Sequence, residues 1–282
     1  MRYTRSIKRP SMWDMLNALP AVGTLIIVTV VLSVLGFILA LTVPDVFASL
    51  ALKPERVFSA FGLLTLVTHL FLHGSFFHLL VNMLSLFFVG GVAERIIGKK
   101  RFVFFYLLAG VFAGLIFVAG AYTGTHFSWG ERVFGGIGDS AVGASGAIFG
   151  LLGILAVLLP NKKVYLIAGP IIFLVLDVVV SPILPGAWGN VFSIFMNILV
   201  MISLLSFFFP RSRFSIVAVP LVLSLWIAPF IAIIPLFILS FYVSLPIANS
   251  AHFGGMIAGL IYGYYLRLRY RRKIALLERY FK

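Results

Sequence analysis

The sequence predicts an all-α, polytopic membrane bundle, because of its composition, its apolar runs and the positions of its basic residues. Hydrophobic residues make up 62% of the 282 residues and charged residues 11%, with a mean hydropathy of +1.13. That balance lies far outside the range of soluble globular domains. The polar interruptions are too short for a sizeable soluble domain, so we predict a single membrane-embedded domain over residues 1–282.

Eight apolar runs approach the roughly 20 residues that a helix needs to cross a hydrocarbon core about 30 Å thick. Backbone groups in lipid must bond internally, so each run is predicted as a helix. The seventh run is interrupted by Pro220, Pro229 and Pro235, and we expect it to be kinked or split. A six-span alternative stays open if two runs between 163 and 245 are re-entrant or interfacial. The runs lie at 21–43, 77–94, 102–122, 145–160, 164–181, 190–209, 214–243 and 251–267.

The basic residues predict the orientation of these runs. A cytoplasmic N-terminus places 19 of the 22 Lys and Arg inside and leaves only Lys53, Arg56 and Arg132 outside. The positive-inside rule therefore favours an even number of spans with both termini cytoplasmic. The first run is too long for a signal-peptide core, so it is predicted to be retained. The inside set is Arg2, Arg5, Lys8, Arg9, Arg95, Lys99, Lys100, Arg101, Lys162, Lys163, Arg211, Arg213 and the seven basic residues of the tail 267–282.

Charge and cysteine content exclude several functions. The net charge of +14 would suggest nucleic acid for a soluble protein, but here the basic residues end apolar runs, so we expect no nucleic-acid partner. Without cysteine there is no thiol catalysis and no Cys-type metal site. His69, His73 and His78 could offer zinc ligands, yet no carboxylate or cysteine completes the set. We therefore expect no metal and no cofactor. A cysteine-free chain with this bias of basic residues also suits a prokaryotic plasma membrane, which is the location that we expect.

Four polar residues from three runs converge on one membrane depth. Ser145 and His252 each lie about 15 residues, or roughly 22 Å, from the cytoplasmic end of their runs. His78 and Asn82 lie roughly 25 Å and 20 Å from the end of theirs. Because the runs were assigned from apolar residues and basic flanks alone, this agreement indicates one site a short way below the outer surface.

These residue types suit peptide-bond hydrolysis. A serine hydroxyl becomes a useful nucleophile when a neighbouring histidine takes its proton, which assigns these roles to Ser145 and His252. The negative charge on the attacked carbonyl oxygen needs donors. Asn82 offers an amide and His78 a ring N–H from the same helix face, and the backbone N–H of Ser145 adds a third.

Glycines accompany both candidate catalytic residues at helical spacing. Small residues along one face permit close approach of two membrane helices. We expect these stripes to bring the serine and histidine helices together. They comprise Gly146, Gly150 and Gly153 after the serine, and Gly255, Gly259 and Gly263 after the histidine.

The motifs resemble those of the rhomboid intramembrane serine proteases. Gly143-Ala144-Ser145-Gly146 is similar to the GxSG nucleophile motif, and Ala251-His252-Phe253-Gly254-Gly255 with Gly259 is similar to AHxxGxxxG. His73, His78 and Asn82 match the pattern HxxxxHxxxN, and the three motifs occur in family order.

The resemblance implies a six-helix core over 21–160 and 246–270, and the remaining runs predict about two extra transmembrane helices within 164–243. It implies that Ser145 is the nucleophile and His252 the base, and that His78, Asn82 and the backbone from Gly143 to Ser145 form the oxyanion site. It further implies cleavage of single-span or polytopic membrane proteins near the outer leaflet, with the substrate helix entering laterally.

Three departures from the family pattern stand out. Leu64-Thr65 replaces a frequent Trp-Arg pair, and Phe149 replaces a tyrosine that packs on the catalytic histidine. The serine-to-histidine separation is long enough for about two extra spans, and the sequence does not identify which run between 164 and 243 is the family's gating fifth helix.

Two alternative functions remain open from the sequence. One is a catalytically silent rhomboid-like protein that binds membrane helices, and the other is a small membrane transporter. Neither Asp139, in the loop before the serine helix, nor Asp177, near the outer end of another run, is an obvious third catalytic residue, so we expect a dyad.

Overall fold

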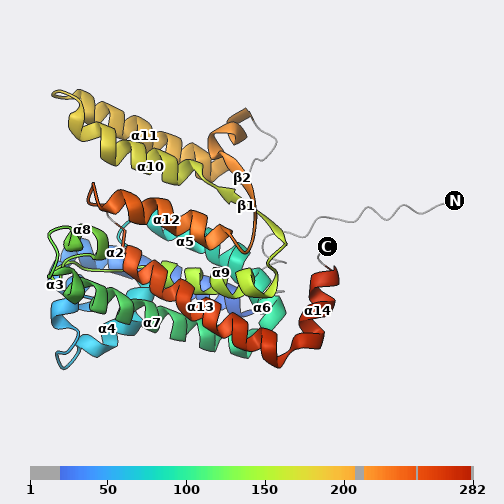
Figure 1. The fold of residues 1–282 in the computed structure, drawn as a ribbon. Coiled ribbons are helices and arrows are strands. Elements are labelled where there is room, and N and C mark those ends of the chain that lie inside the picture. Colours follow the sequence, from blue (N-terminus) through green and yellow to red (C-terminus); the bar gives the residue numbers. More distant parts are fainter. Residues whose placement is uncertain (1–19, 207–212, 246, 281–282) are drawn as a thin grey trace.

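The computed structural model describes residues 20–206, 213–245 and 247–280, which form a bundle of helices with one two-stranded sheet (Figure 1). Some predictions fall on residues outside this described part of the chain. They concern position 246 of the expected core and the expected inside residues Arg2, Arg5, Lys8, Arg9, Arg211 and Lys282.

Each of the eight predicted runs contains a helix, and the prediction of an all-α membrane bundle is confirmed. Among the described residues, four helical stretches are long and apolar enough to cross a membrane: Pro20–Thr42, Phe76–Ile97, Lys99–Gly124 and Trp188–Ser206. The helices of the bundle are α2 (Pro20–Thr42), α5 (Phe76–Ser85), the π-helical η4 (Leu86–Gly90), α6 (Gly91–Ile97), α7 (Lys99–Gly124), α9 (Ser145–Leu158), α10 (Gly169–Val180), α11 (Trp188–Ser206), α12 (Ala228–Ser240) and α13 (Asn249–Arg269).

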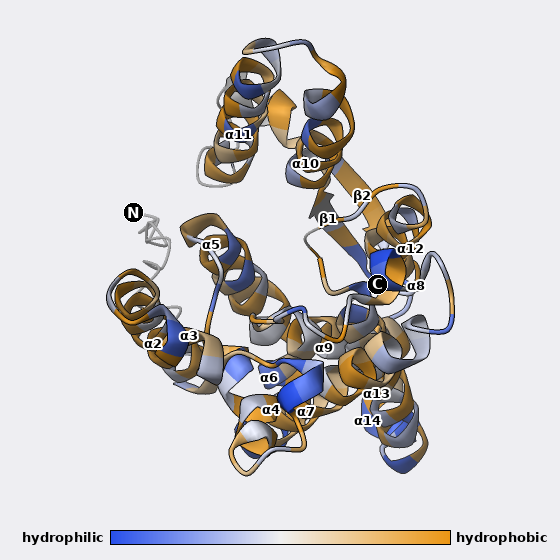
Figure 2. Ribbon diagram, turned by 90° about the vertical axis from the view of Figure 1, so that its left-hand side faces the viewer, coloured by the Kyte–Doolittle hydropathy of each residue, from blue (hydrophilic) through white to orange (hydrophobic). Residues whose placement is uncertain are grey.

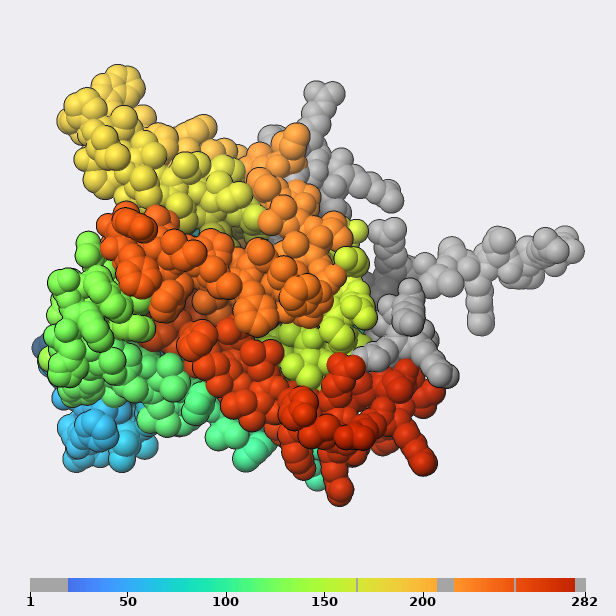
Figure 3. Space-filling view, in the orientation of Figure 1, coloured from blue at the N-terminus to red at the C-terminus, as the bar shows by residue number. Residues whose placement is uncertain are grey.

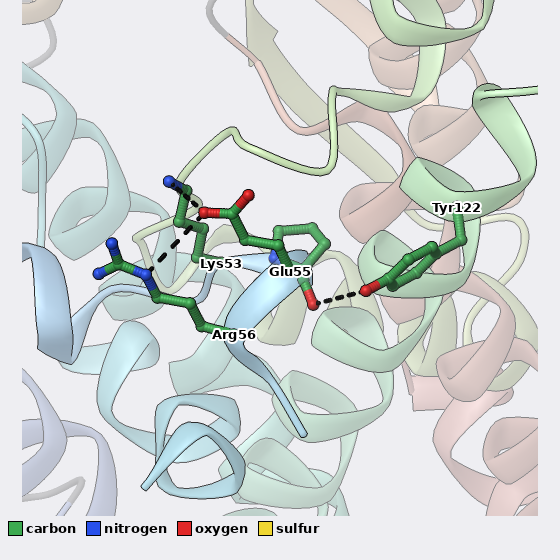
Figure 4. Close-up of polar contacts among 5 residues, drawn as sticks. Lys53, Glu55, Arg56 and Tyr122 are labelled. Carbon is green, nitrogen blue, oxygen red and sulfur yellow. Dashed lines mark hydrogen bonds and ion pairs between the residues drawn. The ribbon is translucent and has the colours of Figure 1, made fainter. Parts of the chain in front are cut away.

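Short helices fill the connection between α2 and α5. The peptide of Leu52 is bridged to that of Ala141, and the Tyr122 hydroxyl of α7 donates to the Pro54 carbonyl at 3.4 Å (Figure 4). Beside this contact the Lys53 ammonium lies 2.7 Å from the Glu55 carboxylate, and its hydrogen bond lowers the pKa of Glu55. The segments are α3 (Pro44–Leu50), η1 (Pro54–Arg56), η2 (Gly62–Leu64), α4 (Thr65–Thr68) and η3 (His69–Phe71), and α8 (Gly130–Phe134) follows α7.

The α2 helix is fastened to the bundle at two depths. At its start the Glu94 carboxylate of α6, which is buried, accepts from the backbone N–H groups of Ala21 at 3.1 Å and Val22 at 2.8 Å. A carboxylate suits the unpaired N–H groups and positive end of a helix N-terminus. Further along, the Ser33 hydroxyl lies 2.9 Å from the Phe71 carbonyl oxygen and 2.8 Å from His73 Nδ1. These bonds connect α2 to the segment that leads into α5.

The prediction of one helix over 164–181 was wrong for its first residues. Strand β1 (Lys163–Ile167) pairs antiparallel with β2 (Pro220–Ser224), with Lys163 opposite Ser224. β-branched and aromatic residues such as Val164 and Tyr165 favour strands, and the helix starts only where Pro170 can occupy its first turn. The expected split of the run 214–243 is confirmed, since η6 (Arg213–Ala218) and β2 precede α12.

The helices α10 and α11, joined by η5 (Ser181–Ile183), form a hairpin that stands apart from the other helices (Figures 1 and 2). In the space-filling view the hairpin forms the top of the molecule, directly above the orange atoms of the bundle (Figure 3). The paired strands β1 and β2, which precede α10 and follow α11 in the chain, connect the hairpin to the bundle. The hairpin has its own polar contacts, since the Ser193 hydroxyl donates to the Asp177 carboxylate at 3.1 Å. The bundle itself is built around α7, α9 and α13, with α12 packed on α9 and α13.

Candidate active site

The structure brings Ser145 and His252 into direct contact. Ser145 is the first residue of α9, and His252 lies in the first turn of α13. Their side chains meet with Ser145 Oγ 2.8 Å from His252 Nε2, although 107 positions separate them. The ring of Phe149 stacks on the imidazole with a centroid distance of 4.6 Å and an interplanar angle of 29°. The phenyl ring therefore holds the histidine from one face without the hydroxyl of a tyrosine.

Close packing of α9 on α13 makes this contact possible. A Cβ at Gly255 would overlap the carbonyl oxygen of Gly146, and a Cβ at Gly259 would overlap that of Gly150. A Cβ at Gly146 would lie 2.6 Å from the Cβ of Ala113 in α7 and 3.5 Å from the Ala251 carbonyl oxygen in α13. Any side chain at Gly255 or Gly259 would push α9 and α13 apart. Because Ser145 and His252 lie in the first turns of these two helices, such a separation would also move the serine away from the histidine.

His78 and Asn82 approach the site from α5. The Ser75 hydroxyl caps this helix by accepting from the His78 backbone N–H at 3.1 Å, and so fixes the turn that carries His78. A Cβ at Gly143 would lie 2.9 Å from His78 Nε2 and 3.8 Å from Asn82 Nδ2, so both side chains border the chain two residues before Ser145. The Asn82 amide donates one hydrogen to the His78 carbonyl at 3.0 Å and has a second hydrogen to offer.

Gly143 forms the turn that leads into the serine helix. Its backbone N–H donates to the His69 carbonyl at 2.8 Å and is therefore already occupied. The residue has a φ of 126°, which side-chain-bearing residues rarely adopt, and the nearby His78 ring leaves no room for a Cβ. In this geometry Gly143 supplies the turn and the space beside the serine, while α9 begins at Ser145 without a side-chain cap.

The two aspartates considered from the sequence are occupied elsewhere. The Asp139 carboxylate accepts from the Gly136 N–H at 2.7 Å, and Asp177 accepts hydroxyl hydrogen bonds from Ser181 and Ser193 within the hairpin. The contact at the centre of the site is therefore between two residues, a serine and a histidine.

A small cavity of about 20 Å³ lies beside the serine. Its lining includes Ser145, Gly146, His69 and Ala113, so it lies between α9, α7 and the segment before α5. A volume of roughly 10–15 Å³ is enough for one water molecule. The site thus has room for a single water next to the serine.

Sequence reasoning did not identify Ser33 as part of the site's support. Its hydroxyl donates to the Phe71 carbonyl, because a carbonyl can only accept, and so it accepts from His73 Nδ1–H. The His73 ring in turn meets the His78 ring edge to face at a centroid distance of 5.0 Å. A hydroxyl inside an otherwise apolar span was the available signal, since such residues often bond across helices.

The fold and the site define an integral, multi-pass membrane protein with a serine–histidine contact between two closely packed helices. The family model for the Rhomboid domain matches residues 60–205, about half of the chain. The chain belongs to the rhomboid family. The matched residues include His78, Asn82 and Ser145 and end before α13, so the geometry alone joins His252 to them.

Curated relatives agree with this assignment. The chain is 38% identical to Rhomboid protease GluP of Bacillus subtilis over 103 residues, which are 36% of this chain and 17% of that protein. It is 38% identical to RHOMBOID-like protein 5 of Arabidopsis thaliana over 101 residues, 36% of this chain and 28% of the relative. With RHOMBOID-like protein 1 of the same plant the identity is 39% over 101 residues, again 36% of this chain, and 22% of the relative. The matches span less than a third of the length of these three relatives.

Proposed function

We propose that this protein is an intramembrane serine endopeptidase in which Ser145 is the nucleophile and His252 the general base. The observation that carries the proposal is the 2.8 Å contact between Ser145 Oγ and His252 Nε2. That distance is within the range in which a base can take the proton of a hydroxyl as it attacks. The family membership and the likeness to a protein named a protease support the same reaction class.

The reaction follows from this pair. Ser145 Oγ attacks the carbonyl carbon of the scissile peptide while His252 Nε2 takes the hydroxyl proton. When the tetrahedral intermediate collapses, the C–N bond breaks and His252 returns the proton to the leaving nitrogen. Water then attacks the acyl-serine, gives a proton to His252 and releases the carboxylic product, after which the proton returns to the serine. The cavity of about 20 Å³ beside Ser145 is suited to supply that water.

We assign the oxyanion donors to His78, Asn82 and the start of α9. The first N–H groups of a helix have no partner within the helix, and they carry its positive end. Ser145 begins α9, so its N–H and the second hydrogen of the Asn82 amide are suited to stabilise the developing negative charge. Gly143 contributes to this site through its turn and its missing Cβ, because its N–H is bonded to His69.

The proposed substrates are single-span or polytopic membrane proteins cleaved near the outer leaflet. The matching depths of the four residues and the excess of basic residues on one side support this location, with both termini in the cytoplasm of a prokaryotic cell. We infer one domain over residues 1–282, and we assign α12 as the fifth core helix on the ground that it packs on α9 and α13.

The test is cleavage of a model transmembrane substrate in proteoliposomes by the wild-type protein and by Ser145→Ala. We expect cleavage by the wild type alone, with product detected by gel and its new terminus by mass spectrometry. Equal cleavage by Ser145→Ala would refute the proposed nucleophile. No cleavage by either, together with no labelling of Ser145 by a fluorophosphonate, would favour a helix-binding protein without catalytic activity.

A further inference from the structure

A second cavity lies at the end of the bundle opposite the serine. Its volume is about 130 Å³, and it is a partly open pocket lined by residues of α6, α7, α9, α13 and α14 (Arg271–Tyr280). Figure 1 shows that α14 turns sharply away from the direction of α13 at the end of the bundle where the C-terminus lies. None of the residues that carry the proposed reaction reaches this cavity.

The floor of the cavity is apolar. Ile97, Leu158, Leu266 and Ile274 line it, and each of these side chains is buried within the main hydrophobic core. They come from four different helices, so the floor belongs to the fold and not to a single surface segment. Such a surface favours hydrocarbon over water.

Two cationic side chains also line the cavity. Arg101 from α7 and Lys273 from α14 both border the cavity, and none of its lining residues in the described part of the chain is acidic. Arg101 is held in place, because its Nη2 donates to the Tyr270 hydroxyl at 2.6 Å and its guanidinium lies 4.8 Å from the Tyr270 ring centroid. The guanidinium keeps further N–H groups for another partner.

We propose that this cavity binds an anionic phospholipid, with the phosphate between Arg101 and Lys273 and the first part of an acyl chain on the apolar floor. Arginine recognises phosphate through paired N–H groups, and lysine adds a compact positive charge. A free anion would leave the apolar floor without a ligand, whereas a lipid fills both parts. The cavity also lies at the membrane face where basic residues gather, which attracts anionic headgroups.

The α14 helix fits this ligand. Arg271, Arg272 and Lys273 are exposed, whereas Ile274 is 5% exposed and packs into the core. Ile274 therefore holds α14 on the bundle while the basic residues face outward, and basic residues next to a membrane attract anionic headgroups. A lipid phosphate that contacts both Arg101 and Lys273 would connect α7 to α14, so the ligand would stabilise the packing of α14 on the bundle.

The test uses the purified full-length protein equilibrated in mixed micelles with phosphatidylglycerol or with phosphatidylcholine. Native mass spectrometry counts the lipids retained. We expect one retained phosphatidylglycerol on the wild type, and at least a tenfold lower occupancy on Arg101→Gln/Lys273→Gln. The matched control is Arg271→Gln/Arg272→Gln, which removes the same charge from residues that do not line the cavity and should keep the lipid. Equal retention of the two lipids, or equal loss in the control, would overturn the proposal.

Two further measurements test whether the ligand is a lipid and whether Lys273 holds it. Phosphatidylglycerol should raise the midpoint of thermal unfolding of the wild type, because a ligand of the folded state stabilises it, whereas inorganic phosphate should not. An equal rise with inorganic phosphate would assign the cavity to a soluble anion and contradict the lipid. Lys273→Gln alone keeps the Arg101–Tyr270 contact and should fold normally with reduced lipid occupancy, and unchanged occupancy in this variant would also count against the site.

Discussion

The helices α9 and α10 are similarly apolar, but α9 is mostly buried inside the protein and α10 is not. Ten of the 14 residues of α9 are buried inside the protein, whereas only Gly169 of the 12 residues of α10 is buried. Small residues explain the difference, because α9 carries Gly146, Gly150 and Gly153 on the side that meets α13, while α10 consists mostly of large residues after its first turn. Hydropathy therefore identifies both helices, and side-chain size decides which of them can hold reacting groups at fixed distance.

The hairpin formed by α10 and α11 has no row of glycines like the one that packs α9 on α13. Its two helices pack on each other, and the strands β1 and β2 connect it to the bundle. Its exposed apolar side chains include Ile194 at 62% and Ile198 at 45%. The proposed site depends on close packing in the bundle. Substitutions in the bundle should therefore change stability and cleavage strongly, whereas matching substitutions in the hairpin should change them little.

The largest effect is expected for Gly259→Val in α13. Its side chain would overlap the Gly150 carbonyl, so we expect a loss of stability beyond the roughly 1–3 kcal/mol typical of overpacking, and cleavage below detection. Unfolding in mixed micelles and substrate cleavage measure the two quantities. Gly138→Ala is the control, because a Cβ there meets nothing within 4 Å. Wild-type activity in well-folded Gly259→Val would show that the close approach is not required.

A second comparison uses the same substitution in both regions. Ile154→Ala in α9 removes a fully buried side chain and should cost about 2–5 kcal/mol of unfolding free energy. Ile198→Ala in α11, at 45% exposure, should cost less than about 1 kcal/mol. Denaturation in mixed micelles measures both variants. Equal losses would mean that the hairpin is as tightly packed as the bundle, contrary to the structure.

Asn82 in the bundle and Asn197 in the hairpin allow the two regions to be compared for their effect on catalysis. Asn82→Ala removes one proposed oxyanion donor and should lower kcat about 10²-fold, with little change in KM. Asn197→Ala in α11 should leave kcat unchanged, since its amide donates only to Ser193 among the described residues. Steady-state cleavage of a model substrate provides both constants. A similar kcat for Asn82→Ala and the wild type would remove this residue from the oxyanion site.

The smallest effect is expected for Asp177→Asn in the hairpin. The amide oxygen can still accept from Ser181 or Ser193, so stability should change by less than about 1 kcal/mol and cleavage should not change. Thermal unfolding and cleavage assays check this outcome. A tenfold fall in kcat would mean that the hairpin takes part in the reaction, and the separation between the two regions would have to be abandoned.

Much of the bundle could be predicted from the sequence, because lipid leaves few choices for apolar runs. The family was correct, and each of the eight runs contains a helix, although the first residues of the run 164–181 form strand β1. The matched depths also pointed to Ser145 and His252, which meet in the structure. Depth is readable because an α-helix rises by a fixed amount per residue.

Other features depend on contacts between distant segments and could not be predicted. Strand β1 forms because Lys163–Ile167 finds its partner beyond α11, and no local pattern fixed that pairing. The sequence could not show that the Gly143 N–H is taken by His69, or that Ser33 bonds His73. These bonds follow from the packing of α2 and of the segment before α5 on the bundle.

The most direct test of the central claim is labelling of Ser145 by a fluorophosphonate in the wild-type protein and in His252→Ala, with Ser145→Ala as the blank. If His252 activates the serine, the wild type should be labelled at Ser145 and His252→Ala should show little or no label, although it folds and retains the same serine. Equal labelling of the wild type and folded His252→Ala would contradict the proposed dyad.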